Sequence, residues 1–523
     1  MNFKRNCFTI IALIGSVLTI SSCKDSNTFS FYYPIEEVSD THEEFVAEDR
    51  SYVKPGDYND YVASIYEQET QNLGSTYEIL TQYTGRHILE GTGDKKILVV
   101  PVQFSDFTIA NLGVQPEEYI SNLNKAFFGS SKNNKFVSVA EYYNRSSYGK
   151  LRITGKVCDQ FYTYPKTVQE INQYKLPRDT VQDCYNKVLT WYEDTYHESL
   201  EDFYIDKENG NQEVAIYLVY TYPTELNTQN PKFFWAYTFQ DRPLSWSSYS
   251  FMNTLAGYPD AHTFIHETGH LFGLMDYYPT DESDIANSVP EPAGRIDMMD
   301  CSVGDHTGLS KMWLNWARPY WVTGEKDVCE ISIGALVDTG DLILINDKWN
   351  GTVFDEYYLI EFYSPTGLNY FDVNTGNNLA KLPTLPGVKI YHVDARLGYY
   401  SVDSSKKLNF SNRYCYEKAT DPTQIIVPSK STKNINIVHD NSTYTNAKDE
   451  DTYLKNNLYE LQLNHVGHSV SGCASNLNLY RKGDVFEDIK SNGRIPLTLN
   501  YKITVTGVSY RGATVKIEKV KED

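Results

Sequence analysis

The chain has 523 residues and a mass of 59.9 kDa, enough for roughly two to four domains with buried cores. Apolar residues make up 41% of the sequence and charged residues 22%, which excludes a disordered chain. The formal net charge of -21 repels phosphate backbones, so we expect no nucleic-acid partner. The 43 tyrosines favour β-rich structure, because their flat rings suit half-buried sheet surfaces.

The N-terminus has the features of an export signal. Lys4 and Arg5 precede an apolar run from Phe8 to Ile20, which is right for a signal peptide and short for a membrane helix. Small residues stand directly before Cys23, as in the bacterial lipobox, where the cysteine is lipidated. We therefore predict a lipoprotein signal peptide at residues 1–22 and a lipid on Cys23. The protein would lie outside the cytoplasm in a bacterial cell envelope, at the outer membrane or cell surface, and touch the membrane through this lipid only. An ordinary secretory signal with a coincidental cysteine is the alternative.

The rest of the chain divides into three parts. Residues 23–93 are polar and acidic and are predicted to form a stalk or pro-segment. Residues 94–325 predict an α/β domain, with strands expected at 97–104, 150–157 and 214–222 and helices at 139–148, 177–196 and 260–273. Residues 326–523 predict a β-rich, sandwich-like region with strands at 357–362, 388–393, 459–463 and 501–505. The expected fold class is α+β.

Six cysteines remain once Cys7 and Cys23 are set aside as signal and lipid site. They are scattered and form no CxxC pair, so a cysteine-ligated zinc site is not expected. An exported protein can form disulfides, and buried free thiols fit the pattern equally well. The sequence leaves both states open for Cys158, Cys184, Cys301, Cys329, Cys415 and Cys473.

The segment His266-Glu267-Thr268-Gly269-His270 has the spacing of a hydrolytic zinc site. His266 and His270 are four residues apart, which on a helix places both imidazoles on one face, as two ligands of one zinc ion require. Glu267 can reach a water on the metal and act as general base without being a ligand. Zinc lowers the pKa of such a water toward ~7 and polarises the scissile carbonyl group.

A third protein ligand is expected, because catalytic zinc usually keeps three protein ligands and one open position. Gly273 can end the helix in the left-handed conformation, after which the chain can return Asp276 to the metal. His262 has the same spacing to His266 and could be mistaken for a ligand. It has no adjacent glutamate, so we predict a supporting or structural role for it.

The extended motif and several other segments resemble the immune inhibitor A-type secreted metallopeptidases. The resemblance covers roughly residues 95–523 and is most specific between about 96 and 395. The segments that carry it are KILVVPVQFSD (96–106), SVAEYYNRSSYGKLRITG (138–155), DYYPTD (276–281), DMMD (297–300), LSKMWLNW (309–316), EYYLIEF (356–362) and LPGVKIYHVD (385–394).

This resemblance implies a metzincin-like zinc endopeptidase domain, one catalytic zinc, often structural calcium, and secretion with an N-terminal pro-region. Residues 297–300 resemble the Met-turn of metzincins, whose methionine forms an apolar floor beneath the metal. We assign that methionine to Met299 rather than Met298, because the pattern is Asp, apolar, Met.

Two features depart from the family or stay open. Metzincins often carry a tyrosine two residues after the methionine, which can help to bind the oxyanion, and here that position is Cys301. Tyr237, Tyr277 and His306 are candidates for this role by residue type only. Acidic residues that could bind calcium occur at 202–208 and at 281–284, but the first group does not fit an EF-hand.

Two functions of different class follow from the sequence. The first is an exported, lipid-anchored zinc endopeptidase that acts on proteins or peptides through a zinc-activated water, with Glu267 as general base. The second is a surface binding or adhesion lipoprotein on a catalytically degenerate peptidase scaffold, favoured by the abundant tyrosines and the missing tyrosine after the Met-turn. The intact set of His266, Glu267, His270 and Asp276 argues for the enzyme.

Overall fold

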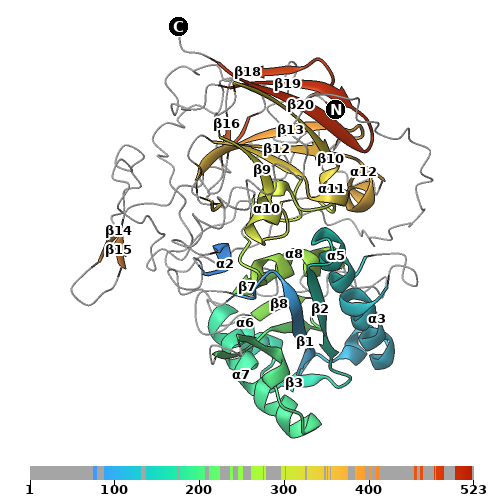
Figure 1. The fold of residues 1–523 in the computed structure, drawn as a ribbon. Helices are drawn as coiled ribbons and strands as arrows, with labels where there is room; N and C mark the ends of the chain where they lie inside the picture. Colours follow the sequence, from blue (N-terminus) through green and yellow to red (C-terminus); the bar gives the residue numbers. More distant parts are fainter. Residues whose placement is uncertain are drawn as a thin grey trace, which may run out of the picture.

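The fold is known from a computed structural model. It describes residues 75–78, 88–130, 137–172, 177–206, 211–223, 236–239, 246–250, 261–274, 276–277, 296–300, 302–323, 327–346, 349, 351–353, 355–374, 383–394, 400–402, 408–410, 453–455, 460–462, 476, 479–487 and 501–520. The signal peptide, Cys23, residues 281–284, Cys301, Cys415 and Cys473 lie outside these residues. Helices and strands both occur throughout, so the fold is mixed α and β (Figure 1).

The first domain is built on a six-stranded sheet with the order β2-β1-β6-β8-β7, to which β3 is added beside β1. All pairs in it are parallel except the β7–β8 pair at one edge. Its strands are β1 (Gly93–Phe104), β2 (Leu151–Val157), β3 (Tyr162–Tyr164), β6 (Ile216–Tyr220), β7 (Tyr237–Phe239) and β8 (Trp246–Ser250). A separate hairpin joins β4 (Tyr204–Asp206) to β5 (Asn211–Val214).

Helices cover both faces of this sheet, which explains why the β1 sequence is apolar without alternation. Ile97 and Val99 belong to one core cluster, together with residues of α3, α5 and α8. Leu98 and Val100 belong to a second cluster on the other face, together with residues of α6 and α7. The helices of the first domain are α3 (Pro116–Phe128), α5 (Val139–Ser146), α6 (Val168–Asn172), α7 (Pro177–Tyr196) and α8 (Ala261–Leu271), and a short α2 (Thr76–Glu78) precedes the sheet.

The second half of the chain forms two further sheets. One has the order β16-β17-β13-β12-β11-β9 and the other β10-β20-β19-β18. The first contains β9 (Pro319–Val322), β11 (Leu342–Ile345), β12 (Glu356–Tyr363), β13 (Gly387–Asp394), β16 (Tyr453–Lys455) and β17 (Glu460–Gln462). The second contains β10 (Val328–Gly334), β18 (Val485–Glu487), β19 (Tyr501–Val508) and β20 (Gly512–Lys519). Short elements between them are α10 (Gly308–Trp313), α11 (Leu336–Thr339), α12 (Tyr370–Asn374) and the β14–β15 hairpin (Tyr400–Val402 and Leu408–Phe410).

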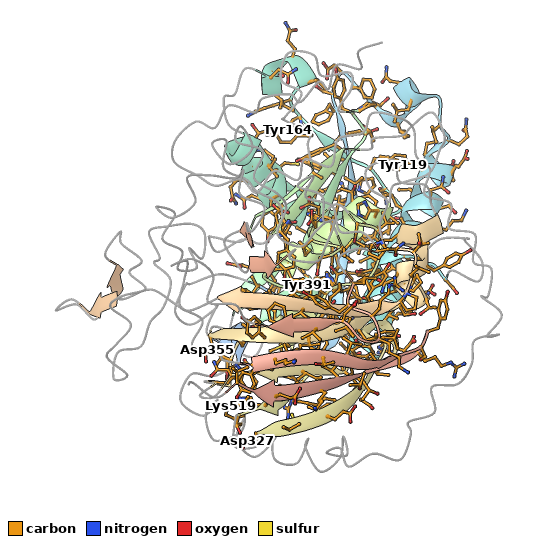
Figure 2. All side chains as sticks on the ribbon, turned by 90° about the horizontal axis from the view of Figure 1, so that it is seen from above. Tyr119, Tyr164, Asp327, Asp355, Tyr391 and Lys519 are labelled. Carbon is orange, nitrogen blue, oxygen red and sulfur yellow. The ribbon has the colours of Figure 1, made fainter. Side chains whose placement is uncertain are left out.

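The two C-terminal sheets pack against each other, as expected for a sandwich-like region. Tyr358 on β12 meets Phe486 on β18 edge-to-face, with ring centroids 5.3 Å apart. Figure 2 shows Tyr391 on the side of this region nearest the first domain, with Asp327 and Lys519 at the far end. Lys519 donates its backbone N–H to the carbonyl of Asp327 at 2.8 Å and so closes that end of the β10–β20 pair.

Contacts cross two of the predicted domain boundaries. The stalk is predicted to end at residue 93, and four residues earlier Leu89 is 2% exposed and donates its backbone N–H to the carbonyl of Leu271 at the end of α8. The C-terminal region is predicted from residue 326, and β9, which precedes it, pairs in parallel with β11. Apolar side chains on both sides of each boundary therefore lie in one core cluster.

Side chains of the C-terminal region hold the backbone that follows the Met-turn. Asp372 accepts a hydrogen bond from the backbone N–H of Val303 at 2.7 Å. Glu361 accepts one from the backbone N–H of Gly308 at 2.6 Å. These buried hydrogen bonds connect the C-terminal region to the segment that follows residue 300. The β-rich region therefore helps to stabilise the first domain.

Two further observations concern the cysteines and the hydrophobicity of the helices. Cys158 and Cys184 are buried and form no disulfide. Among the residues that the structure describes, no helix is both long and apolar enough to cross a bilayer.

Candidate metal centre

Helix α8 (Ala261–Leu271) lies between the first sheet and the C-terminal sheets (Figure 1) and is almost entirely buried. Two tyrosine hydroxyls from the surrounding elements hold it in place. Tyr143 donates to the carbonyl of Ile265 at 2.8 Å, and Tyr217 donates to the carbonyl of Phe264 at 2.9 Å. Phe264 packs into the core, so the opposite face of the helix presents the polar residues of the motif.

In each of the two motif imidazoles, one ring nitrogen forms a hydrogen bond with a backbone carbonyl oxygen. His266 Nδ1 lies 2.8 Å from the oxygen of Met298, and His270 Nδ1 lies 2.8 Å from the oxygen of Leu274. A carbonyl oxygen only accepts, so each Nδ1 carries the hydrogen. The neutral rings therefore direct a lone pair on Nε2 toward the same point, as metal-ligating histidines do.

The turn after α8 brings Asp276 to that point. Gly273 has φ +86°, the left-handed conformation that ends a helix and that other residues adopt at a cost. Asp276 Oδ1 then lies 3.0 Å from Nε2 of His266 and 3.2 Å from Nε2 of His270. Burial raises the pKa of Asp276, but charge and hydrogen bonds from the two imidazoles in their protonated form outweigh burial and lower that pKa.

Glu267 lies beside these atoms and is fully buried. Thr238 on the edge strand β7 donates to its Oε2, with the two oxygens 2.9 Å apart, while its Oε1 makes no hydrogen bond to any residue that the structure describes. Burial raises the pKa of Glu267, and the charge of Asp276 adds to this effect. The sequence analysis missed Thr238, because nothing in its local pattern indicates that β7 passes next to α8.

These groups could hold a metal ion. His266, Glu267 and His270 each offer a ligand atom, and the three atoms lie within 4.8 Å of one another. Asp276 is closer still to both imidazole nitrogens. Without a cation, the lone pairs of the two neutral imidazoles and of the carboxylate would face one another in a buried site, which is unfavourable. A bound cation would accept these lone pairs and therefore suits this arrangement.

The Met-turn lies directly under α8. A Cβ atom on Gly269 would stand 2.4 Å from Sδ of Met299, so the helix has no room for a side chain there. Met299 therefore contacts the helix between the two histidines, where its sulfur and methyl group supply an apolar surface. Met298 is also buried, and its contribution to the centre is the backbone carbonyl that contacts His266.

Asp297, the first residue of the Met-turn, is a buried carboxylate with many donors. It accepts hydrogen bonds from the backbone N–H groups of Met299 and Thr307, at 2.7 and 2.6 Å, and from the imidazole of His306. Burial on its own would raise the pKa of Asp297. The bonds from His306 and from the two N–H groups outweigh burial and lower this pKa to about 2.

Asp297 is expected to make the protein acid-sensitive. Its folded-state pKa lies below the ordinary value of 3.8, so its stabilisation is complete above about pH 4 and is lost as the pH falls through about 2. The shift corresponds to about 2 kcal/mol of unfolding free energy. Urea unfolding of the wild type and Asp297→Asn between these pH values should show a difference that shrinks on acidification. A constant difference would contradict the assignment.

Other predicted residues lie away from the converging ligand atoms. His262 Nε2 contacts the backbone oxygen of Ser302 at 2.8 Å, which fits the structural role expected for it. The hydroxyl of Tyr277 bonds to that of Ser310. Nδ1 of His306 bonds to Asp297 and its ring packs against Tyr143, whereas its Nε2 makes no hydrogen bond to any residue that the structure describes. The side chain of Tyr237 lies outside the described residues. Of the possible calcium ligands, Asp202 pairs with Lys96 at 2.6 Å.

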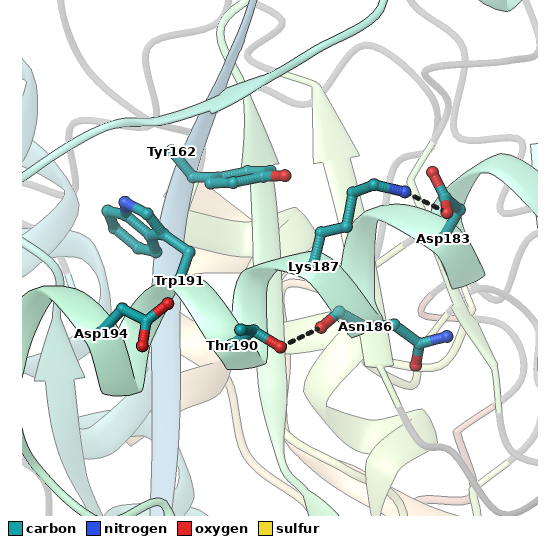
Figure 3. A pocket seen from close by; sticks show the side chains of 7 residues that line it. All are labelled: Tyr162, Asp183, Asn186, Lys187, Thr190, Trp191 and Asp194. Carbon is teal, nitrogen blue, oxygen red and sulfur yellow. Dashed lines mark hydrogen bonds and ion pairs between the residues drawn. The ribbon is translucent and has the colours of Figure 1, made fainter.

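A separate hollow lies along α7 on the far side of the first sheet (Figure 3). The ion pair of Lys187 and Asp183 lies at one end of it and Trp191 at the other. Its lining residues are Tyr162, Asp183, Asn186, Lys187, Thr190, Trp191 and Asp194. None of them belongs to the centre at α8. No protein-family model and no curated protein matches the sequence.

Proposed function

We propose that the protein is a zinc-dependent endopeptidase that is exported and anchored by a lipid on Cys23. The observation that carries this proposal is the convergence of two imidazole nitrogens and the Asp276 carboxylate beside Glu267, whose Oε1 makes no hydrogen bond to any residue that the structure describes. The similarity of residues 96–395 to immune inhibitor A-type metallopeptidases supports the same assignment. Substrates would be proteins or peptides outside the cytoplasm.

The donor set suits zinc better than the other common metals. Two nitrogen ligands and one carboxylate oxygen are a usual set for catalytic zinc, with a fourth position left open. Calcium and magnesium prefer sites made of oxygen atoms only. A closed structural zinc site would be rich in cysteine, and no cysteine that the structure describes is part of this cluster.

The chain's own residues supply the proton transfers of the proposed reaction. Zinc, when bound, polarises the scissile carbonyl and lowers the pKa of a water molecule. Thr238 holds Oε2 of Glu267, so Oε1 is the oxygen able to take a proton from the attacking water. Glu267 then returns this proton to the nitrogen of the leaving amine. The carbonyls of Met298 and Leu274 keep both imidazoles in the tautomer that leaves Nε2 for the metal.

Metal removal tests the proposal directly. The full-length mature protein should contain about one zinc ion per chain by elemental analysis. Casein hydrolysis should disappear after treatment with a zinc chelator and return when zinc is added back, whereas chelator already saturated with zinc should have no effect. Chelator-resistant hydrolysis would contradict a metal-dependent peptidase. Bound zinc without hydrolysis of any protein substrate would instead favour the alternative, a binding lipoprotein on this scaffold.

A further inference from the structure

Two ligand residues of the candidate centre depend on the Met-turn, residues 297–300. The imidazole of His266 is oriented by the carbonyl of Met298 at 2.8 Å. Tyr277, which directly follows Asp276, donates its backbone N–H to the carbonyl of Met299 at 2.8 Å. One short turn therefore sets the direction of one imidazole and the position of the chain that carries the carboxylate.

Asp297 fixes this turn in two directions. Its Oδ1 accepts the backbone N–H of Met299 at 2.7 Å, and its backbone carbonyl accepts the N–H of Asp300 at 2.8 Å. Its Oδ2 accepts both the backbone N–H and the hydroxyl of Thr307, just before α10, at 2.6 and 2.7 Å. The carboxylate thus joins the Met-turn to the start of α10 and is itself completely buried.

A second link runs from Asp297 to the residue after the carboxylate ligand. The hydroxyl of Ser310 donates to Oδ2 of Asp297 at 2.9 Å. The hydroxyl of Tyr277 lies 2.7 Å from that of Ser310. Because Ser310 uses its hydrogen on Asp297, it accepts the hydrogen of Tyr277. Tyr277 is therefore held by its backbone through Met299 and by its side chain through Ser310, and both contacts lead to the same carboxylate.

We propose that Asp297 is a positioning residue that aligns His266 and Asp276 for metal binding. The inference rests on the proposed function, since it concerns the ligands of that same centre. Both oxygens of Asp297 accept hydrogen bonds, which a carboxylate can do and an amide cannot. In Asp297→Asn one of these oxygens becomes an NH₂ group, which would face hydrogen-bond donors. The turn must then move, either away from the N–H of Met299 or away from Thr307 and Ser310.

Asp305 provides the matched control, because it is a second buried carboxylate in the same part of the fold. It is 3% exposed and accepts hydrogen bonds from Nζ of Lys311 at 2.7 Å and from the backbone N–H of His306 at 2.9 Å. Lys311 contacts no ligand residue in any bond described above. His306 is bonded to Asp305 through its backbone N–H, whereas its imidazole is the group that bonds to Asp297. Asp305→Asn makes the same chemical change and should lower stability without moving the ligands.

The experiment measures zinc affinity of the full-length mature protein by competition with a chromophoric chelator, together with the visible absorption spectrum of the cobalt-substituted protein. Asp297→Asn should bind zinc roughly 10–100-fold more weakly than the wild type and show an altered cobalt spectrum, as expected when the groups that orient ligands are changed. Asp305→Asn should keep the wild-type affinity and spectrum. Thermal unfolding of the metal-free proteins shows how much stability each variant loses.

The inference is overturned if folded Asp297→Asn binds zinc as tightly as the wild type with an unchanged spectrum, or if Asp305→Asn weakens binding equally. If Asp297→Asn fails to fold, Ser310→Ala becomes the deciding variant. It removes the hydroxyl that joins Asp297 to Tyr277 and leaves the Asp297 carboxylate in place. Weaker binding and an altered spectrum support the inference, and wild-type behaviour rejects it. Neither readout requires peptidase activity, so a wild type that binds zinc but does not cleave protein would reject the proposed function alone.

Discussion

Replacing Glu267 by glutamine is expected to abolish proteolysis while leaving the metal bound. Glutamine preserves the shape of the side chain and can still accept the hydrogen bond from Thr238. It cannot take a proton from the attacking water, and loss of general acid–base catalysis typically costs a factor of about 10²–10⁴ in rate. Casein hydrolysis and zinc content should be measured on the same preparations, so that a fall in rate is not attributed to lost metal.

Glu361→Gln is a suitable control for this variant. Glu361 is as deeply buried as Glu267, at 1% exposed, but it lies on β12, pairs with Lys389 and accepts the N–H of Gly308. Glutamine has one acceptor oxygen and can keep only one of these two bonds, so some stability should be lost. Neither partner is a residue of the metal centre, so the folded variant should retain activity. Equal activity of Glu267→Gln and the wild type would reject Glu267 as the base, and with it the peptidase assignment at this site.

Replacing Asp276 by alanine is expected to remove both metal and activity. Its Oδ1 lies 3.0 and 3.2 Å from the Nε2 atoms of His266 and His270, and alanine would leave the ion with two protein ligands. Loss of a direct ligand should exceed the ~10–100-fold weakening produced by residues that only orient ligands. Zinc competition titrations on the wild type, Asp276→Ala and Glu267→Gln provide the comparison.

The two variants together distinguish the roles of the two carboxylates. Glu267 also lies close enough to the imidazoles to serve as a ligand, within 4.8 Å of their nitrogens. If Glu267→Gln lost zinc while Asp276→Ala kept it, the ligand and the base would have to be exchanged. We expect the reverse, because one oxygen of Glu267 is held by Thr238 and the other makes no hydrogen bond to a described residue.

Local sequence patterns were sufficient for most of the elements around the centre. The helix expected at 260–273 is α8 at Ala261–Leu271, and α7 begins and ends at the predicted residues. The strands expected at 97–104 and 150–157 are β1 and β2. Hydrophobic periodicity, a proline at a helix start and a glycine after a helix end are local signals, so they do not depend on which element packs on which.

One element was missed although the sequence carries its signals. Helix α3 begins at Pro116, has Glu117 and Glu118 in its first turn and ends before Gly129. Its buried residues, which include Tyr119, Leu123, Ala126 and Phe127, follow helical spacing. Contacts across the domain limits were harder to predict, because Leu89 bonds to Leu271, more than a hundred residues away, and β9 pairs with β11 across the intervening β10.

The shared face of His266 and His270 on α8 could be read from the sequence, because it follows from the helical repeat. Gly273 also indicated that the chain turns back toward these two residues. The hydrogen bond from Thr238 to Glu267, and the contacts of Asp297 with the turn on which His266 and Asp276 depend, became visible only in the folded structure. These contacts join β7, α8, the Met-turn and α10, and such contacts arise from packing of distant segments, which no local spacing encodes.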